Sequence, residues 1–367
     1  MSPRASAETA LLLRALHAPV ELDEPGWDGL LRRARASGLH ARLAAAQAAT
    51  PGLPDVVRRH FLSASRIAAY RRKLMEAELF QLAALCDTGF PVVVLKGAAY
   101  ALQRRRMATG RFVSDVDLLV PAAHLRTMEQ ALLAAGWRSE ALSPYDERYY
   151  RDWSHETPPL RFPGHSLELD LHHAITPVTG SLAFDPAPLF ARCEPLAGTP
   201  FHALAAEDQV LHACVHCFHD GDLALRVREV VDIDGLLREL AVRAGFWDNL
   251  LARAAELGLQ RPLWYGLHFA RAWLDCPVPA AVLATLPAPA APVRRIMDAL
   301  VARAMLPGDL DGPPSPGVRL ARTAMLVRYH RLRMPAHLLL PHLVRKTLLR
   351  LRASIAAKKE APDASAP

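Results

Sequence analysis

Apolar residues recur at three- and four-residue spacing over most of the chain, which is the pattern of helices with one buried face. Before residue 89 this pattern predicts helices over 7–17, 27–48 and 54–87, with Pro or Gly between them. From residue 204 onward it predicts further helices, with breaks near Gly221, Gly245, Gly258, 277–279, 287–292 and 307–316. Both ends of the chain are therefore expected to be helical.

The pattern changes between these helical regions. Val92, Val93, Val94 and Leu95 form a short apolar run of the kind found in buried strands. After it, the sequence predicts a helix over 98–107, a strand over 112–120, a helix over 124–135, an aromatic-rich stretch over 145–155 and strands over 160–162 and 166–172. Pro163 and Gly164 favour a turn between the last two strands, and hence a hairpin.

Length and composition agree with this division. A chain of 367 residues exceeds the size at which one core usually stops growing, and 51% apolar residues can fill more than one packed region. We predict an α+β protein with a helical N-terminal region (1–88), a small mixed α/β core (89–203), a helical C-terminal region (204–353) and a disordered tail (354–367).

The five cysteines are an odd number scattered along the chain, which is unlike a disulfide framework and favours a reducing compartment. The N-terminal residues lack the pattern of a secretion signal. No apolar stretch reaches the roughly 18 residues needed to span a bilayer. We expect a cytoplasmic protein that is soluble or at most peripheral.

The net charge of +7 is concentrated near the C-terminus, where residues 319–359 contain eleven Lys or Arg and no acidic residue. This segment is a candidate for weak contact with a polyanion or a membrane surface. Alternatively, two helices around 319–333 and 337–352 pack on the body and leave their arginines solvated.

The main candidate for chemistry is a pair of acids, Asp115 and Asp117, on the predicted strand 112–120. The two-residue period of a strand puts both carboxylates on one face while Val116 and Leu118 point to the other. Such close anions repel one another unless a cation lies between them, and hard oxygen ligands suit Mg²⁺. A solvated pair at a strand end is the alternative.

A second strand adds a third acid. In 166–172, leucines alternate with Glu168, Asp170 and His172, so the polar residues share one face. Three carboxylates on adjacent strands are what a site for two metal ions about 4 Å apart requires. Asp170 is the predicted third ligand and proton acceptor, and Glu168 is the alternative third ligand.

Residues around these acids are candidates for phosphate binding. Lys96 and Gly97 lie where the first strand leads into a helix, and free N–H groups at a helix start attract phosphate. Arg111 and Ser114 precede the two aspartates. The alternatives are a solvated Lys96, an Arg111 paired with a structural carboxylate and a Ser114 that only opens the strand.

Three further groups of residues allow more than one interpretation. His212, His216 and His219 share a helical stripe and suggest zinc, but a structural zinc needs four convergent ligands, so a buried helix that lines the cleft is favoured. Arg226, Arg228 and Asp232 form either an ion-pair network or, through Arg226 or Arg228, a contact with bound phosphate. The aromatic residues of 145–155 either stack on a base or form a packed flap.

Several of these segments together resemble a known family. Leu95-Lys96-Gly97, Arg111, the run from Ser114 through Asp115 and Asp117 to Val120, and Asp170-Leu171-His172 resemble the uncharacterised nucleotidyltransferase family of the polymerase-β-like superfamily. The stretches from Glu207 to His219 and from Arg226 to Asp232 are similar to its helical part. The resemblance is good over 80–240. It implies a polymerase-β-like core with a mixed sheet, a nucleoside triphosphate donor such as ATP, and Mg²⁺ or Mn²⁺ held by Asp115, Asp117 and Asp170.

The sequence thus predicts a metal-dependent nucleotidyltransferase that transfers a nucleoside monophosphate to an acceptor hydroxyl. Gly97 is followed by Ala98, whereas the superfamily usually has Gly or Ser there. This departure supports the alternative of a nucleotide-binding or scaffold protein with weak or no catalysis. A peripheral protein that binds polyanions through its basic C-terminal helices is the third hypothesis.

Overall fold

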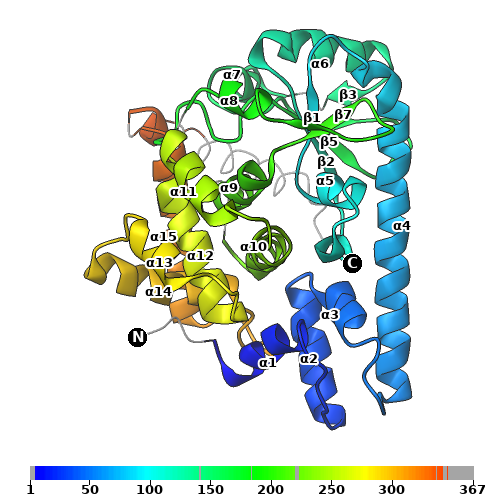
Figure 1. The fold of residues 1–367 in the computed structure, drawn as a ribbon, viewed down its shortest axis with the longest axis vertical. Helices are drawn as coiled ribbons and strands as arrows, with labels where there is room; N and C mark the ends of the chain where they lie inside the picture. The colour runs from blue at the N-terminus through cyan, green and yellow to red at the C-terminus, as the bar shows by residue number, and fades with distance from the viewer. Residues whose placement is uncertain are drawn as a thin grey trace, which may run out of the picture.

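A seven-stranded mixed sheet forms one part of the molecule, and helices from both ends of the chain pack around and beside it (Figure 1). The computed structural model describes residues 5–139, 142–182, 184–219, 223–335, 337–341 and 345. The strands are β1 (Val92–Val94), β2 (Asp115–Leu119), β3 (Arg138–Ser139), β4 (Leu160–Arg161), β5 (Glu168–His172), β6 (Glu194–Pro195) and β7 (Phe201–Ala203). The predicted α+β class is confirmed, and the four-part division stays a prediction.

The sheet order is β3-β4-β5-β2-β1-β7-β6. β2 pairs in parallel with β5, and β1 in parallel with β7, while the other neighbours are antiparallel. The predicted hairpin is present as β4 and β5, with Gly164 at φ +86 in its turn. β6 and β7 were not predicted, because two- and three-residue strands are too short to produce a periodic pattern.

The helices before and within the sheet region are α1 (Ala7–Ala15), α2 (Glu24–Ala36), α3 (His40–Ala46), α4 (Asp55–Cys86), α5 (Lys96–Leu102), α6 (Leu125–Ala134), α7 (Pro144–Asp152) and α8 (Ala187–Phe190). Two short 3₁₀ helices, η1 (Arg106–Ala108) and η2 (Ala122–His124), join them. The prediction of one helix over 27–48 was wrong. Gly38, at φ +66, takes the left-handed conformation that commonly ends a helix, so α2 stops and α3 begins at His40.

Helix α4 runs along the edge of the molecule from the N-terminal helices to the sheet (Figure 1). Near its start it packs against α3, and Phe61 meets Trp27 of α2 edge to face at 5.9 Å. Further along, α4 contacts α6 and β2. The N-terminal helices and the sheet are therefore joined by one continuous element.

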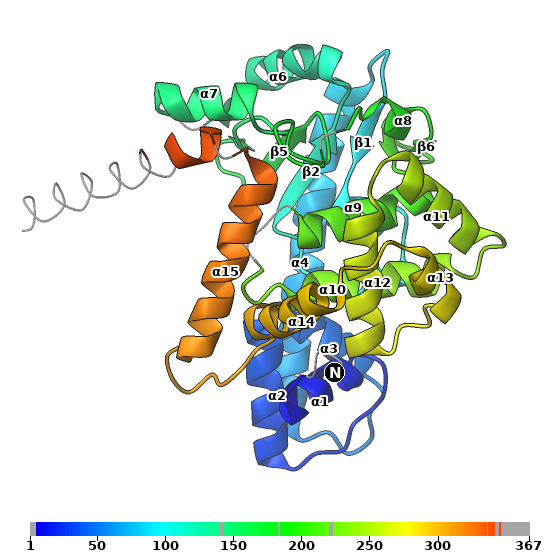
Figure 2. The same ribbon diagram turned by 90° about the vertical axis from the view of Figure 1, so that its left-hand side faces the viewer.

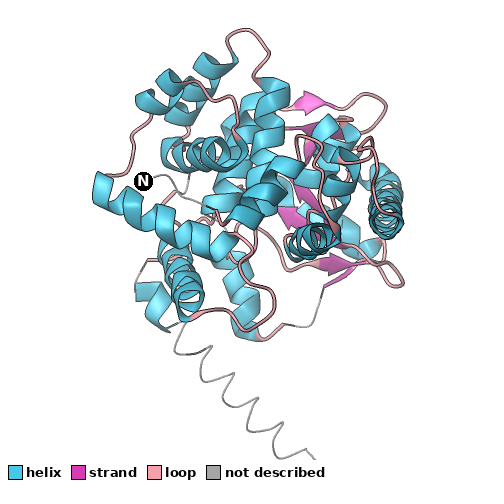
Figure 3. Cartoon of the chain, turned by 90° about the horizontal axis from the view of Figure 1, so that it is seen from below, coloured by secondary structure: helices cyan, strands magenta, loops and turns pink. Residues whose placement is uncertain are grey.

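The C-terminal helices are α9 (Ala206–Phe218), α10 (Val227–Leu240), α11 (Phe246–Glu256), α12 (Gln260–Leu274), α13 (Ala280–Thr285), α14 (Ala291–Met305) and α15 (Pro316–Arg333). α9, α10 and α12 pack on one another, and α15 packs on α14 (Figure 2). Seen from below, the strands lie together toward one side of the molecule, with helices on both sides of them (Figure 3).

Part of the basic C-terminal segment is packed rather than solvated. On α15, Arg328 donates to the carbonyl of Phe218 at 2.6 Å, and Arg333 lies over the ring of Tyr149 at 5.5 Å. Most of 342–367, including the predicted disordered tail, lies outside the described residues. Within the described residues, no helix combines the length and the apolar character needed to cross a membrane.

Candidate functional site

The two strands that carry the predicted acids lie side by side near the middle of the sheet. β2 and β5 pair so that Asp117 is opposite Asp170 and Asp115 is opposite Glu168. Side chains of directly paired residues point to the same face, and each strand alternates faces with a period of two. These four acids and His172 therefore share one face, while buried valine and leucine side chains occupy the other.

Asp117 is the buried member of this group, with 3% of its surface exposed. Its Oδ1 accepts hydrogen bonds from Lys96 Nζ at 2.8 Å and from His172 Nε2 at 3.0 Å. Burial alone would raise the pKa of Asp117, but Lys96 and His172 hold it well below the usual value. The carboxylate is therefore ionised, and because both contacts fall on Oδ1, Oδ2 can serve another ligand.

Lys96 reaches Asp117 from an uncommon backbone conformation. Its φ is +47, in the left-handed region that residues with a side chain rarely adopt. It stands at the start of α5, directly after β1, and backbone strain of this kind gathers at functional sites. The residue with the strained backbone, Lys96, is thus the one whose ammonium group binds the buried carboxylate of Asp117.

Asp170 has the opposite electrostatic situation. Burial raises its pKa to about 8, and the negative charges of Asp117, Glu156 and Asp115 act in the same direction. The ionised form is disfavoured because the carboxyl group is buried and its charged neighbours are mainly negative. This face of the sheet would therefore be stabilised by a bound cation.

The remaining predicted residues on this face have other partners. Glu168 forms an ion pair with Arg161 and its side chain is 38% exposed. Ser114 donates a hydrogen bond to Asp115 Oδ1 at 3.1 Å. Glu168 thus points to the surface, and Ser114 orients Asp115.

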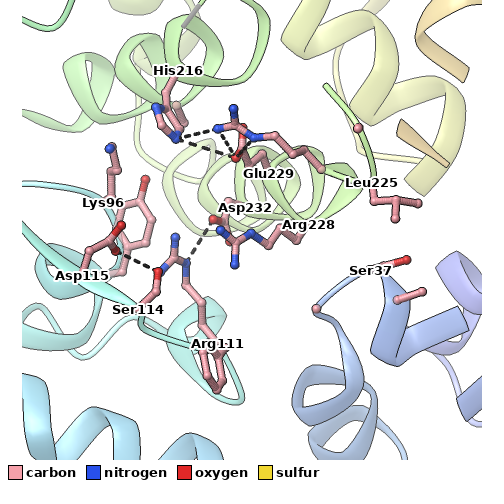
Figure 4. Close-up of a pocket in the computed structure, with 17 residues that line it drawn as sticks. Ser37, Lys96, Arg111, Ser114, Asp115, His216, Leu225, Arg228, Glu229 and Asp232 are labelled. Carbon is pink, nitrogen blue, oxygen red and sulfur yellow. Dashed lines mark hydrogen bonds and ion pairs between the residues drawn. The ribbon is translucent and has the colours of Figure 1, made fainter. Parts of the chain in front are cut away.

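A cavity of about 460 Å³ opens beside the acids (Figure 4). Its walls come from the start of α5, the loop before β2, helices α9 and α10, and the turn between α2 and α3. The charged and polar residues that line it include Lys96, Arg111, Ser114, Asp115, His216, Arg226, Arg228, Glu229 and Asp232. Asp115 and Lys96 connect the cavity to the carboxylate face, whereas Asp117 and Asp170 are not among the lining residues.

Arg111 forms part of a buried ion-pair network. Its Nε donates to Asp232 Oδ2 at 3.0 Å, and Arg42 of α3 pairs with the other oxygen of the same carboxylate. Burial opposes the ionisation of Asp232, but Arg111 and Arg42 hold its pKa below the usual value. This cluster joins the N-terminal helices, the loop before β2 and α10.

Gly97 has a structural reason to be glycine. A Cβ at this position would lie 1.9 Å from Arg111 Nη1. The guanidinium of Arg111 therefore lies over the first turn of α5, where the sequence suggested backbone N–H groups open to phosphate. Gly97 is buried beneath Arg111 and does not line the cavity.

Of the two interpretations of Arg226, Arg228 and Asp232 left open by the sequence, an ion-pair network formed by these three residues does not match the contacts of the described residues. Arg226 pairs with Glu229 and contacts His216 at 2.9 Å, while Asp232 is held by arginines from outside α10. Arg228 extends past Gly38 into the cavity (Figure 4), and among the described residues no carboxylate pairs with it.

The histidine stripe on α9 lies inside the protein. His212 is buried, and burial together with the nearby Lys96 lowers its pKa well below the usual value. His216 lines the cavity. Within the described part of the chain, the side chains close enough together to hold a metal ion do not include this stripe. The favoured interpretation, a buried helix that lines the cleft, fits this arrangement.

Sequence reasoning missed Glu156, Arg42 and the role of Asp232. Glu156 directly follows the aromatic-rich stretch and joins β5 by a single bridge to His172, which gives no strand pattern. Arg42 and Asp232 are 190 positions apart, so nothing in the local sequence indicates their pairing.

A mixed sheet with acids on one face and flanking helices is consistent with a nucleotidyltransferase-type fold. The chain belongs to the uncharacterised nucleotidyltransferase family, whose family model matches residues 23–275. The match extends the resemblance seen over 80–240 to α2, α3 and α4 on one side and α12 on the other. The N-terminal helices that form one wall of the cavity are thus part of the family unit.

Other comparisons add little. No curated protein matches the chain. Among solved structures, the crystal structure of JHP933 from Helicobacter pylori is similar at 13% identity, covering 64% of this chain and 97% of that chain with a TM-score of 0.30. A likeness of this degree supports no functional argument.

Proposed function

We propose that this protein transfers a nucleoside monophosphate from a nucleoside triphosphate to an acceptor hydroxyl, with Mg²⁺ or Mn²⁺ held by Asp115, Asp117 and Asp170. The observation that carries the proposal is the pairing of Asp117 with Asp170 on adjacent parallel strands, with Asp115 on the same face. The donors are carboxylate oxygens, which are the ligands that Mg²⁺ prefers. The raised pKa of Asp170 indicates that positive charge is lacking there.

The cavity supports a triphosphate as the donor. Lys96, Arg111 and Arg228 line it, and Arg228 is the one of these three without a carboxylate partner among the described residues. Arg111 remains positively charged in its pair with Asp232, so it contributes charge while its position is fixed. Ser114 orients Asp115, and both residues line the cavity.

In the proposed reaction, the acceptor oxygen forms a bond to the α-phosphorus while the bond from that phosphorus to the pyrophosphate oxygen breaks. Bound Mg²⁺ would neutralise the charge of the triphosphate and of the leaving pyrophosphate. Asp170 is the carboxylate proposed to take the proton of the acceptor hydroxyl, because general-base catalysis needs a proton acceptor within hydrogen-bond reach of that hydroxyl. Lys96 keeps Asp117 ionised throughout.

Titration calorimetry with ATP, GTP, CTP and UTP, with and without Mg²⁺, tests the proposal. Asp115→Asn should remove metal-dependent binding and turnover without unfolding the protein. Glu168→Gln is the matched control, because it changes an acid on the same face that is paired with Arg161. It should bind as the wild type does.

The results separate the hypotheses. Mg²⁺-dependent binding that is lost in Asp115→Asn and kept in Glu168→Gln supports the site, and pyrophosphate release then identifies acceptors. Binding without pyrophosphate release would favour the nucleotide-binding or scaffold alternative. If no nucleotide binds to the folded wild type, the proposal is wrong.

A further inference from the structure

His155, Glu156 and His172 come together beside the carboxylate face. One ligand atom from each of these residues lies within 4.8 Å of the other two. His155 and His172 are buried at 2% and 3% exposure, and Glu156 is partly exposed. Two imidazoles and a carboxylate make a different kind of donor set from the all-oxygen group of Asp115, Asp117 and Asp170.

Backbone pairing brings these residues together. The segment before β4 runs antiparallel to the end of β5, where Thr157 N donates to Leu171 O at 2.8 Å and His173 N donates to His155 O at 2.9 Å. Glu156 is thus directly opposite His172 in a pair without mutual backbone hydrogen bonds. In such pairs the Cα atoms are only about 4.5 Å apart and the side chains are adjacent.

The distances between the side chains suit a shared ion better than direct hydrogen bonds. His172 Nδ1 is 3.6 Å from Glu156 Oε2, and His155 Nε2 is 3.9 Å from the same oxygen. Both separations exceed the usual hydrogen-bond length. Ligands about 2.1 Å from a tetrahedral ion lie about 3.4 Å from one another, close to the His172–Glu156 separation.

The other nitrogen of His172 is oriented as in known metal centres. His172 Nε2 bonds to Asp117 Oδ1 at 3.0 Å, which fixes the ring and directs Nδ1 toward Glu156. A histidine that binds metal usually donates its second ring N–H to a carboxylate in this way. Glu156 also lines a second cavity of about 560 Å³, so an ion beside it would have access to solvent for a fourth ligand.

We propose that His155, Glu156 and His172 bind one first-row transition-metal ion, with Zn²⁺ as the preferred ion, at a site separate from the proposed Mg²⁺ site. Imidazole nitrogen suits Zn²⁺, whereas Mg²⁺ requires oxygen ligands. The ion ties the segment after α7 to β5 and holds His172 against Asp117. This site does not depend on the proposed transfer reaction.

The test uses the full-length protein, stripped with a chelator and titrated with Co²⁺, whose visible absorption reports nitrogen ligands in a site of low coordination number. The wild type should bind one Co²⁺, Zn²⁺ should displace it, and excess Mg²⁺ should not. The zinc content of the protein before stripping, measured by elemental analysis, should also be close to one ion per chain.

Variants assign the ligands. His155→Ala and Glu156→Gln should lose the Co²⁺ signal, and Asp117→Asn should weaken it roughly 10- to 100-fold because it removes the charge that orients His172. His165→Ala is the matched control, because His165 is partly exposed and pairs with Glu78. Asp115→Asn should keep the signal, which separates this site from the proposed Mg²⁺ site.

Circular dichroism verifies that each variant is folded. If His155→Ala does not fold, Glu156→Gln provides the ligand test, since the Glu156 side chain is 26% exposed. The proposal is overturned if folded wild type binds no Co²⁺, if Mg²⁺ displaces Co²⁺, or if Asp115→Asn abolishes the signal while Glu156→Gln retains it.

Discussion

Asp170 on the carboxylate face of the sheet and Asp232 in the wall of the cavity differ in how their charge is compensated. Asp232 is buried between Arg42 and Arg111, and these two guanidinium groups hold its pKa below the usual value. Asp170 lies among other acids, and its pKa is raised to about 8. The side chain is the same, so the difference comes from the neighbours alone.

This difference distinguishes a structural carboxylate from a candidate ligand. Asp232 has its counter-ions within the chain, and they come from separate regions, so the pairing holds α3, the loop before β2 and α10 together. Asp170 has too few counter-ions, so it should gain from a cation supplied from solution. Removing the charge should therefore destabilise the folded protein at Asp232 and stabilise the metal-free folded protein at Asp170.

The largest effect on stability is expected for Asp232→Asn. The change leaves Arg42 and Arg111 buried without an anion, which typically destabilises a protein by about 3–5 kcal/mol. Chemical denaturation measures the loss. Asp152→Asn is the matched control, because Asp152 also pairs with an arginine, Arg148 at 3.0 Å, but at the surface. A loss at Asp232 as small as that of the control would contradict the structural role.

Asp170→Asn should act in the opposite direction in metal-free protein. Since the folded-state pKa is raised, the folded protein retains a proton that the unfolded chain has released, so wild-type stability falls as pH rises from about 4 to about 8. The variant should lack this part of the slope and be more stable near pH 8. Each pKa unit corresponds to about 1.4 kcal/mol, and solvent screening of the partly exposed Asp170 reduces the gain to on the order of 1–2 kcal/mol. Denaturation across this range in the presence of a chelator measures it. If the stability of the two proteins depended on pH in the same way, folding would not raise the pKa of Asp170.

Gly97→Ala tests how Arg111 links the start of α5 to Asp232. The added methyl group would displace the guanidinium from above α5 and weaken its bond to Asp232, at a cost of about 1–2 kcal/mol. Gly89→Ala is the control, because a methyl group there would meet no atom within 4 Å. In an Arg111→Ser background the Gly97→Ala penalty should largely disappear, and a double-mutant cycle measures this. If Gly97→Ala destabilised the Arg111→Ser protein as much as the wild type, the clash would not be with Arg111.

The smallest effect is expected for Glu168→Gln. Its pair with Arg161 is partly exposed, so the loss of stability should stay below about 1 kcal/mol. Calorimetric titration with Mg²⁺ should give the wild-type affinity. A clear loss of Mg²⁺ binding would make Glu168, rather than Asp170, the third ligand.

The sequence predicted the acids of the site better than their surroundings. Alternation in β2 and β5 put Asp115, Asp117 and Asp170 on common faces, and the parallel register then brought the strands together. A period-two pattern involves only residues that are close together in the chain, so it can be recognised in a single sequence. The ion pair between Arg42 and Asp232 is not local, and the conformation of Gly38 at φ +66 divides a segment that the apolar pattern reads as one helix. Glu156 was missed because an isolated bridge leaves no periodic signal.

The long helix α4 limits where members of the family can gain or lose residues. Its 32 residues span about 48 Å, and the buried residues Phe61, Ala68, Met75 and Leu82 recur every seven positions along one stripe. One end of that stripe faces the N-terminal helices, and the helix reaches the sheet further along. A single inserted residue would turn one end by about 100° relative to the other and expose half of the stripe. Insertions and deletions among homologues should therefore fall in the loops that flank α4, while the helix itself keeps its residue count.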